Sequence, residues 1–295
     1  MNPKITAFVL GILIYCPSLF SQEKTGSKLY LKIYGNYGFL SPGSYTSPST
    51  NSNSGSTTTF TIQKNGLGSG PRFGGGIGVI LNDFINIGID ADYLSGSKLT
   101  SSSNYVYPSG DTYNYSTEID QKVLSIIPNV TFRAVATPQY YIYTRLGIAI
   151  GLPTIQVKTN NFQHYSSGGN INDDSSRVTS KYTFKVGLGY QAAIGIQFNL
   201  SENLRGFVEV VANSLVLYPT KLQDASNVQV HYVNGTMTAN YPQSIYIYQY
   251  EKTGTYSYVA PPPPVNNTTT YTYVQPQFSM SVNSINIGIG IAYRF

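Results

Sequence analysis

The amino-acid sequence predicts an all-β protein, an antiparallel transmembrane β-barrel of eight strands, and three observations lead to this prediction. Residues 284–295 alternate bulky apolar side chains with small or polar ones, which is the period of two of a β-strand. The connections between the predicted strands alternate between short and long. The composition, with 27 Tyr and 28 Gly and few amphipathic helical stretches, favours β structure with long polar loops.

A half-buried strand of a soluble sandwich also has one apolar face, so the alternation in one segment fits both a membrane barrel and a soluble sandwich. The faces of the other strands decide between them. In residues 139–151 one face carries Leu146 and Ile148, and the other carries Arg145 and Gly147. The next strand repeats this pattern, with glycine and alanine opposite its apolar residues. A glycine-rich face fits a narrow lumen better than the open surface of a soluble sheet.

The alternation predicts eight strands, at residues 28–39, 72–81, 84–94, 123–134, 139–151, 182–199, 204–214 and 278–295. Short connections join them at residues 82–83, 135–138 and 200–203, and long ones at residues 40–71, 95–122, 152–181 and 215–277. This organisation is typical of outer-membrane barrels, whose short turns lie in the periplasm and whose long loops are extracellular. An even number of strands returns both chain ends to the turn side.

Residues 1–21 have the pattern of a secretory signal peptide, with Lys4 before a short apolar stretch and small residues before the expected cleavage. Residues 22–27 are then expected to form a short periplasmic N-terminal segment, and residues 28–295 the outer-membrane barrel. Cys16, the single cysteine, lies inside the signal peptide, so no disulfide or cysteine-ligated metal is expected after cleavage. The net charge of +5 is not clustered, so no nucleic-acid partner is expected.

The long connection before the last strand contains further extended segments. Asn234-Gly235 predicts a tight hairpin turn. Residues 244–250 and 255–259 carry bulky side chains on both faces, without the glycines of the lumen-facing strands. We therefore expect sheet that protrudes beyond the membrane as hairpins. A barrel of ten or twelve strands, in which these segments cross the membrane, is the alternative.

Aromatic residues fall near the ends of the predicted strands on their apolar faces, as in the two aromatic girdles of a membrane barrel. At the loop ends lie Tyr37, Phe39, Phe73, Tyr93 and Phe184, and at the turn ends Phe132, Tyr140, Phe198, Tyr293 and Phe295. The alternative is that Tyr and Phe merely favour strands.

The alternating loop lengths, strand patterns such as Tyr143-Thr144-Arg145-Leu146-Gly147 and the terminal Phe295 resemble the small eight-stranded outer-membrane barrels of the OmpA/OmpX type over residues 28–295. The resemblance implies location in the outer membrane of a Gram-negative-type bacterium and contact with outer-membrane lipid and lipopolysaccharide. It also implies insertion by the barrel-assembly machinery with periplasmic chaperones. Ile291, Tyr293 and Phe295 would then form the C-terminal assembly signal.

Some members of this family carry a C-terminal peptidoglycan-binding domain after the barrel. We expect no such domain here, because a barrel strand is the last element of the sequence. We also expect a monomer.

Four charged residues lie at similar depth from the turn end of their strands, on faces that the alternation assigns to the lumen: Lys32, Asp90, Arg145 and Glu209. Charges facing lipid at mid-membrane are costly, so we expect mutual ion pairs that fill the bore. The interior of an eight-stranded barrel is just wide enough for side chains, so this lumen charge cluster would plug it. A gated ion or proton path is the functional alternative.

The sequence thus predicts a structural or adhesion-like surface protein with a plugged lumen, and not an enzyme. The long loops are rich in Ser, Thr, Asn and Tyr, a composition of adaptable binding surfaces, so an unknown extracellular ligand is left open beside a hydrated surface that binds nothing. A narrow pore for small solutes or ions is the alternative function. A lipid-modifying enzyme is a minor alternative, because His164 and His231 lie in predicted loops with no spacing that fixes a triad or a metal site. No catalytic, cofactor-binding or metal-binding residue is assigned, and no cofactor is expected.

Overall fold

The structure, a computed structural model, describes residues 28–40, 48–54, 57–62, 66–136, 139–242, 245–252 and 270–295. Every regular element among these residues is a β-strand, so the predicted all-β class is confirmed. The predicted signal peptide, the segment 22–27 and the extended segment 255–259 lie outside the described residues.

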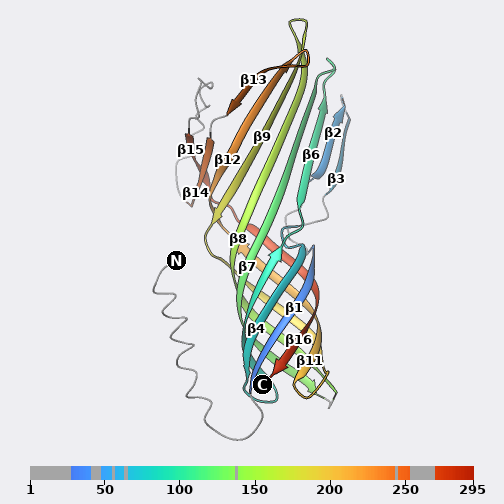
Figure 1. Cartoon of the computed structure of the whole chain (residues 1–295), viewed down its shortest axis with the longest axis vertical. Helices are drawn as coiled ribbons and strands as arrows, with labels where there is room; N and C mark the ends of the chain where they lie inside the picture. The colour runs from blue at the N-terminus through green and yellow to red at the C-terminus, as the bar shows by residue number, and fades with distance from the viewer. Residues whose placement is uncertain are drawn as a thin grey trace.

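Eight strands pair in a closed antiparallel ring (Figure 1). In ring order they are β1 (Leu29–Leu40), β4 (Gly70–Ile80), β5 (Ile85–Ser95), β7 (Thr112–Ala136), β8 (Tyr140–Ser167), β10 (Gly187–Asn199), β11 (Leu204–Leu217) and β16 (Met280–Arg294). The pairing of β16 with β1, from Leu40 opposite Ser284 to Tyr30 opposite Arg294, closes the ring. Each predicted strand overlaps one strand of the ring. The predicted short connections all lie at one end of the ring, which we call the turn end.

Strands β7 and β8 continue beyond the other end of the ring and form the centre of a second, open sheet, the upper sheet (Figure 1). Beside β7 lie β6 (Leu99–Val106), β2 (Pro48–Ser54) and β3 (Thr57–Ile62), and beside β8 lie β9 (Asn170–Phe184), β12 (Pro219–Val233), β14 (Ile245–Glu251) and β15 (Thr270–Pro276), with β13 (Thr236–Pro242) paired to β12. The prediction of loops at residues 95–122 and 152–181 is therefore wrong for most of both segments. Both faces of these strands carry Ser, Thr and Asn, so no apolar period marks them in the sequence.

The predicted hairpin at Asn234-Gly235 joins β12 to β13. Both residues have positive φ angles, 49° and 77°, as a type I′ turn requires. The segment predicted to be extended at residues 244–250 is β14, which pairs with β12 of the upper sheet and with β15. Among the described residues, these segments belong to the protruding sheet and not to the ring.

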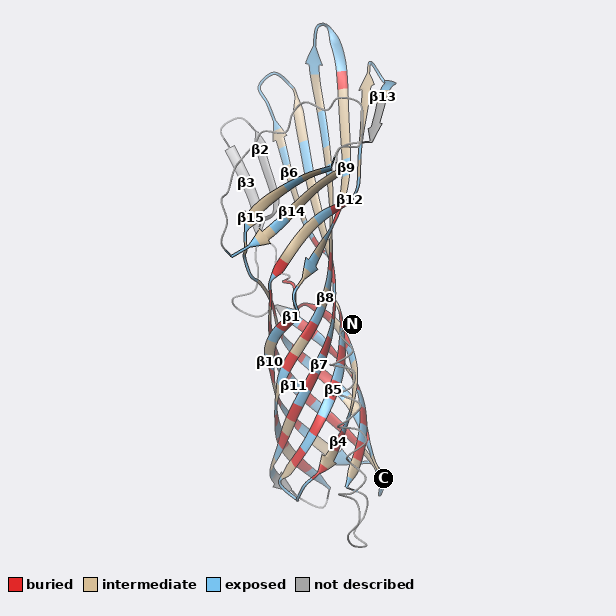
Figure 2. Cartoon of the chain, turned by 90° about the vertical axis from the view of Figure 1, so that its left-hand side faces the viewer, coloured by how far each residue is buried: buried red, intermediate tan, exposed pale blue. Residues whose placement is uncertain are grey.

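Residues of the ring strands alternate between exposed and buried positions (Figure 2). The exposed face is apolar, with Ile289 66% and Leu188 62% exposed. The buried face is mostly small, polar or aromatic, and its aromatic rings cover glycines of neighbouring strands, as Tyr34 covers Gly74. The ring is therefore narrow enough to be filled by its own side chains.

Near the upper end of the ring the buried face becomes apolar. One cluster, which we call the apolar layer, consists of Leu67, Leu94, Leu99, Val123, Ile127, Ala149, Ile155, Leu215, Leu217 and Val282. Leu67 comes from the segment before β4, where its carbonyl accepts a hydrogen bond from the Gln121 side-chain amide. The same segment passes so close to β16 that a Cβ on Gly68 would overlap the backbone carbonyl of Asn283.

Phe184 does not join the predicted outer girdle, and this prediction is wrong. Its side chain is half-buried against the apolar layer, with the ring 5.7 Å from that of Tyr182. The alternation looks continuous across this point in the sequence, but β9 ends at Phe184 and β10 begins at Gly187. The two residues between the strands reverse the phase, so even-numbered residues face inward at the end of β9 and outward in β10.

Gly68→Ala is expected to lower the free energy of unfolding by about 1–3 kcal/mol, because the added methyl group must displace the backbone of β16. Gly35→Ala is the matched control, since a Cβ at Gly35 would meet only ordinary contacts, the nearest at 3.6 Å from Phe73. Urea unfolding of both variants in detergent, followed by far-ultraviolet circular dichroism, measures the difference. Equal stability would show that the segment before β4 does not pack against β16 as described.

Candidate functional site

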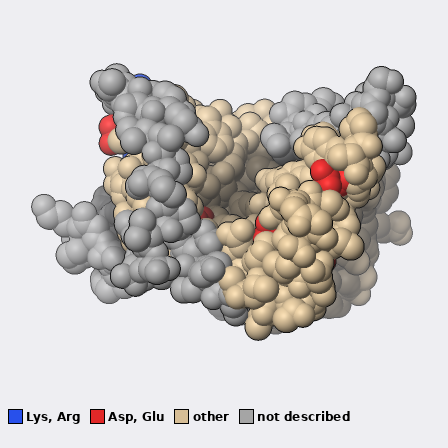
Figure 3. Space-filling model, turned by 90° about the horizontal axis from the view of Figure 1, so that it is seen from above, with Lys and Arg blue, Asp and Glu red and all other residues tan. Residues whose placement is uncertain are grey.

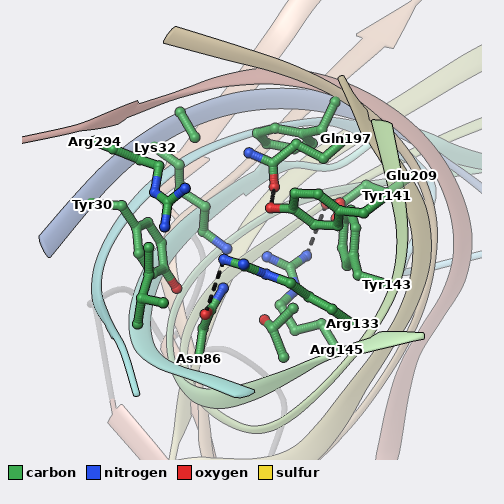
Figure 4. Close-up of a pocket in the computed structure, with 14 residues that line it drawn as sticks. Tyr30, Lys32, Asn86, Arg133, Tyr141, Tyr143, Arg145, Gln197, Glu209 and Arg294 are labelled. Atoms are coloured by element: carbon green, nitrogen blue, oxygen red, sulfur yellow. Dashed lines mark hydrogen bonds and ion pairs between the residues drawn. The ribbon is translucent and has the colours of Figure 1, made fainter. Parts of the chain in front are cut away.

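Four charged side chains from four ring strands meet inside the ring, and three of them are seen in Figure 4. Lys32 Nζ on β1 lies 2.8 Å from Asp90 Oδ2 on β5. Arg145 on β8 binds two acids, with Nη1 2.8 Å from Asp90 Oδ2 and Nη2 2.8 Å from Glu209 Oε1 on β11. The Tyr143 hydroxyl donates to Glu209 Oε2 at 2.8 Å. The structure thus brings together the residues predicted as the lumen charge cluster, and we call this group with Tyr143 the charge network.

Two contacts of the charge network cross a glycine on the strand that lies between the two partners. Lys32 is level with Gly76 on β4, and Gly76 is level with Asp90. Tyr143 reaches its acidic partner over Gly195 on β10 in the same way. A Cβ on Gly76 would overlap the Asp90 carboxylate, and one on Gly195 would overlap the Tyr143 ring. The glycine-rich face noted in the sequence therefore leaves the space in which the polar side chains meet.

A further ion pair lies two residues nearer the upper end of β5, where Arg72 Nη1 is 2.8 Å from Asp92 Oδ1. Six buried charges then balance in the interior, namely Lys32, Arg72 and Arg145 against Asp90, Asp92 and Glu209. Loss of one partner from such a set leaves an uncompensated buried charge, which costs far more than an exposed ion pair contributes.

The apolar layer lies above the charge network, and the two occupy successive levels of the ring. Asp90 and Leu94, one from each level of β5, are both 0% exposed. Above the apolar layer, between the ring and the upper sheet, opens a pocket of about 560 Å³ whose lining includes Ile119, Tyr182 and Met280. Solvent reaches this pocket, whereas Asp90 and Leu94 beneath it are closed off from solvent.

A smaller cavity, of about 40 Å³, lies at the turn end of the interior, on the other side of the charge network (Figure 4). We call it the inner cavity. Its wall includes Arg133, Arg294, Tyr141, Asn86 and Gln197. Arg133 donates to Asn86 Oδ1 at 3.2 Å, and its guanidinium carbon lies 4.7 Å from the centre of the Tyr141 ring. The Tyr141 hydroxyl in turn donates to the Gln197 side chain.

The remaining girdle residues of the prediction are exposed on the outer face of the ring: Tyr37, Phe39, Phe73, Tyr93, Phe132, Tyr140 and Phe198. At the C-terminus, Ile291, Tyr293 and Phe295 share that outer face, and the rings of Tyr293 and Phe295 meet edge to face at 5.2 Å. A role of these three residues in assembly stays a prediction.

The two histidines lie in the upper sheet, each beside an aspartate. His164 Nδ1 is 2.6 Å from Asp173 Oδ1, and His231 Nδ1 is 2.5 Å from Asp174 Oδ1. Within the described ranges no serine hydroxyl bonds to either imidazole, and no group of three or more His, Cys, Asp or Glu side chains is placed to hold a metal ion. No helix in the described part of the chain is long and apolar enough to span a membrane.

Sequence reasoning missed two features of the interior. The apolar layer leaves a signal in stretches that are apolar on both faces, such as Leu215-Val216-Leu217 near the upper end of β11. The basic turn end leaves a signal in Arg133, Arg205 and Arg294, which lie close to the turn ends of β7, β11 and β16. Both signals are visible only when the strands are aligned by their turn ends.

No protein-family model matches the chain, and no curated protein matches it. Among solved structures it is similar to the outer membrane protein AlkL in lipid bilayers, with a TM-score of 0.32 and 10% identity over 93% of this chain and 94% of that one. A Pseudomonas aeruginosa FadL homologue gives a TM-score of 0.21 and 8% identity, over 91% and 90% of the two chains. Salmonella typhi OmpF in complex with daunomycin gives 0.10 and 7%, over 92% and 98%.

Arg145→Met is expected to lower the free energy of unfolding by about 3–5 kcal/mol, because the Asp90 and Glu209 carboxylates lose their shared cation. Adding Glu209→Gln should recover part of this loss. A double-mutant cycle from urea unfolding of refolded protein in detergent measures the coupling, and additive effects would reject the pairing. Lys98→Met, which removes an exposed ion pair to Glu118 in the upper sheet, is the control and should change stability little.

Proposed function

We propose that this protein is an eight-stranded outer-membrane β-barrel with a closed lumen, and that it acts as a structural and surface-interaction protein through its upper sheet. The single observation that carries the proposal is the filled interior. The charge network and the apolar layer occupy two successive levels of the ring, and residues such as Asp90 and Leu94 are shut off from solvent. A protein that moved solutes through its lumen would need both levels to open.

The exterior of the ring supports the membrane assignment. Its outer face is apolar and carries exposed aromatic residues toward both ends, while the six buried charges of the ring interior are paired. A closed ring also leaves no strand edge without hydrogen-bond partners, which a lipid environment requires. We place the short turns in the periplasm of a Gram-negative-type bacterium and the upper sheet outside the cell. Outer-membrane lipid and lipopolysaccharide then surround a monomeric barrel.

The upper sheet supports a role in surface interaction. On the parallel pair β14 and β15, the rings of Tyr246 and Tyr271 stack at 5.7 Å, and those of Tyr248 and Tyr273 stack at 5.6 Å. Seen from above, the described surface is mostly uncharged and hollowed in the middle (Figure 3). Tyrosine on a polar, weakly charged surface provides large, rigid contact area at low entropic cost.

The proposal includes no catalytic step and no cofactor. Its alternative is a narrow pore for small solutes or ions, in which the charge network rearranges to conduct. A lipid-modifying enzyme remains a minor alternative, in which His164 or His231 would act as the base. The pore differs from the leading function in that its interior must open. The enzyme differs in that a serine must approach an imidazole.

Purified protein reconstituted into planar lipid bilayers is expected to show no stable open conductance level, because two side-chain levels fill the ring. Heat-modifiable gel mobility of the same preparation confirms that the inserted protein is folded. Lys98→Met, altered only in the upper sheet, should give the same closed trace. A well-populated open level in folded wild-type protein would replace the closed-lumen proposal with the pore.

Deletion of Phe295 is expected to reduce the amount of protein in the outer membrane several-fold, if the assembly machinery reads the terminal aromatic. The same deletion should barely change unfolding in detergent, because one residue at a strand end contributes little packing. Phe39→Ala is the control, since Phe39 is an exposed outer-face aromatic at the opposite end of the ring. Protease shaving of the upper sheet on intact cells measures surface levels. Normal levels after the deletion would limit Phe295 to an interfacial anchor.

A further inference from the structure

We propose that the inner cavity binds a phosphate group, held by the guanidinium groups of Arg133 and Arg294 in its wall, with the positive charge of Arg205 nearby. This site lies at the turn end of the ring, apart from the upper sheet that carries the proposed surface role. It is a second function of the molecule and does not depend on the first.

The three arginines are cations without an acidic partner. No salt bridge in the described part of the chain joins any of them to a carboxylate, whereas each cation of the charge network has one. Arg294 lies close enough to Arg205 and Arg133 for their charges to repel it, and Asp83 in the β4–β5 turn attracts it. Three like charges gathered near one cavity with low-dielectric walls attract an anion.

The guanidinium groups are also held in place before any ligand arrives. Those of Arg133 and Arg205 lie over the Tyr141 ring, at 4.7 and 5.7 Å from its centre. Arg133 is fixed further by its hydrogen bond to Asn86. The Nε atoms of Arg133 and Arg205 are nevertheless buried with no hydrogen-bond partner. A buried unsatisfied donor costs free energy, and a bound oxyanion would supply the missing acceptor.

A phosphate group matches the site in charge, geometry and size. The planar guanidinium fork binds two phosphate oxygens at once, and such charge-assisted pairs are the strong ones. The cavity of about 40 Å³ admits a group of a few atoms and excludes a long polyanion. On the side of the charge network, Asp90 and Glu209 are already bound to Arg145, so they do not repel the ligand as free carboxylates would.

Isothermal titration of the refolded full chain in zwitterionic detergent with inorganic phosphate, at constant ionic strength against chloride, tests the site. Wild-type protein should bind saturably at one site. Arg133→Gln and Arg294→Gln should each weaken binding at least tenfold, since each removes one charged fork. Arg177→Gln is the matched control, because Arg177 is exposed in the upper sheet and bonds Asn160 there; its affinity should equal that of wild type.

A second titration, with short-chain phosphatidic acid, identifies the source of the phosphate. If phosphatidic acid binds more tightly than inorganic phosphate, and the same two variants lose this binding, the ligand is a lipid headgroup. If phosphatidic acid binds equally or more weakly, the ligand is a free phosphate. Heat-modifiable gel mobility of each variant shows whether it is folded. If Arg133→Gln does not fold, Arg294→Gln decides alone, because the Arg294 side chain makes no hydrogen bond within the described residues. Absence of saturable binding to either ligand, or binding that survives the variants that fold, would overturn the proposal.

Discussion

Space across the ring is the constraint on which the rest of the structure depends. An eight-stranded ring has room for its own side chains and little more, so several large inward residues lie beside a glycine on a neighbouring strand. Glycine supplies that room, since Lys32 and Asp90 meet over Gly76, and Tyr34 lies over Gly74. The charge network, the aromatic rings and the glycines therefore pack together as one unit. A change in any one of them is felt by the other two.

The sequence predicted the ring strands and their faces because the period of two is set by local geometry alone. It also predicted which charged residues meet, since Arg145 and Glu209 could lie only on the inward face at similar depth. Phe184 was misplaced because a two-residue break reverses the phase, and a break of that length leaves no mark in the alternation. The upper sheet was predicted only as scattered hairpins. Its strands are polar on both faces, so their pairing depends on partners distant in the chain, such as β9 with β12.

Along its axis the ring interior changes from basic to neutral to apolar. At the turn end Arg133, Arg205 and Arg294 have no acidic partner among the described residues. In the middle the network balances its charges, and at the upper end the interior is apolar. The charge network and the apolar layer fill the ring between the turn end and the upper pocket. Access to the turn end and access to the upper pocket are therefore separate.

The charge network also specifies strand register. This effect explains the presence of buried charges better than their contribution to stability does. A buried ion pair often contributes little net stability, because desolvation offsets the attraction. A slip of β5 by one residue, however, would turn Asp90 and Asp92 toward lipid and bring Ile89 against the cations of β1 and β8. Each aspartate facing lipid at mid-membrane would cost roughly 3 kcal/mol, and each cation left without its partner would add to this. The free energy of the slipped register is thus raised by several costs at once. This holds even where the network contributes almost no net free energy to the stability of the correct register.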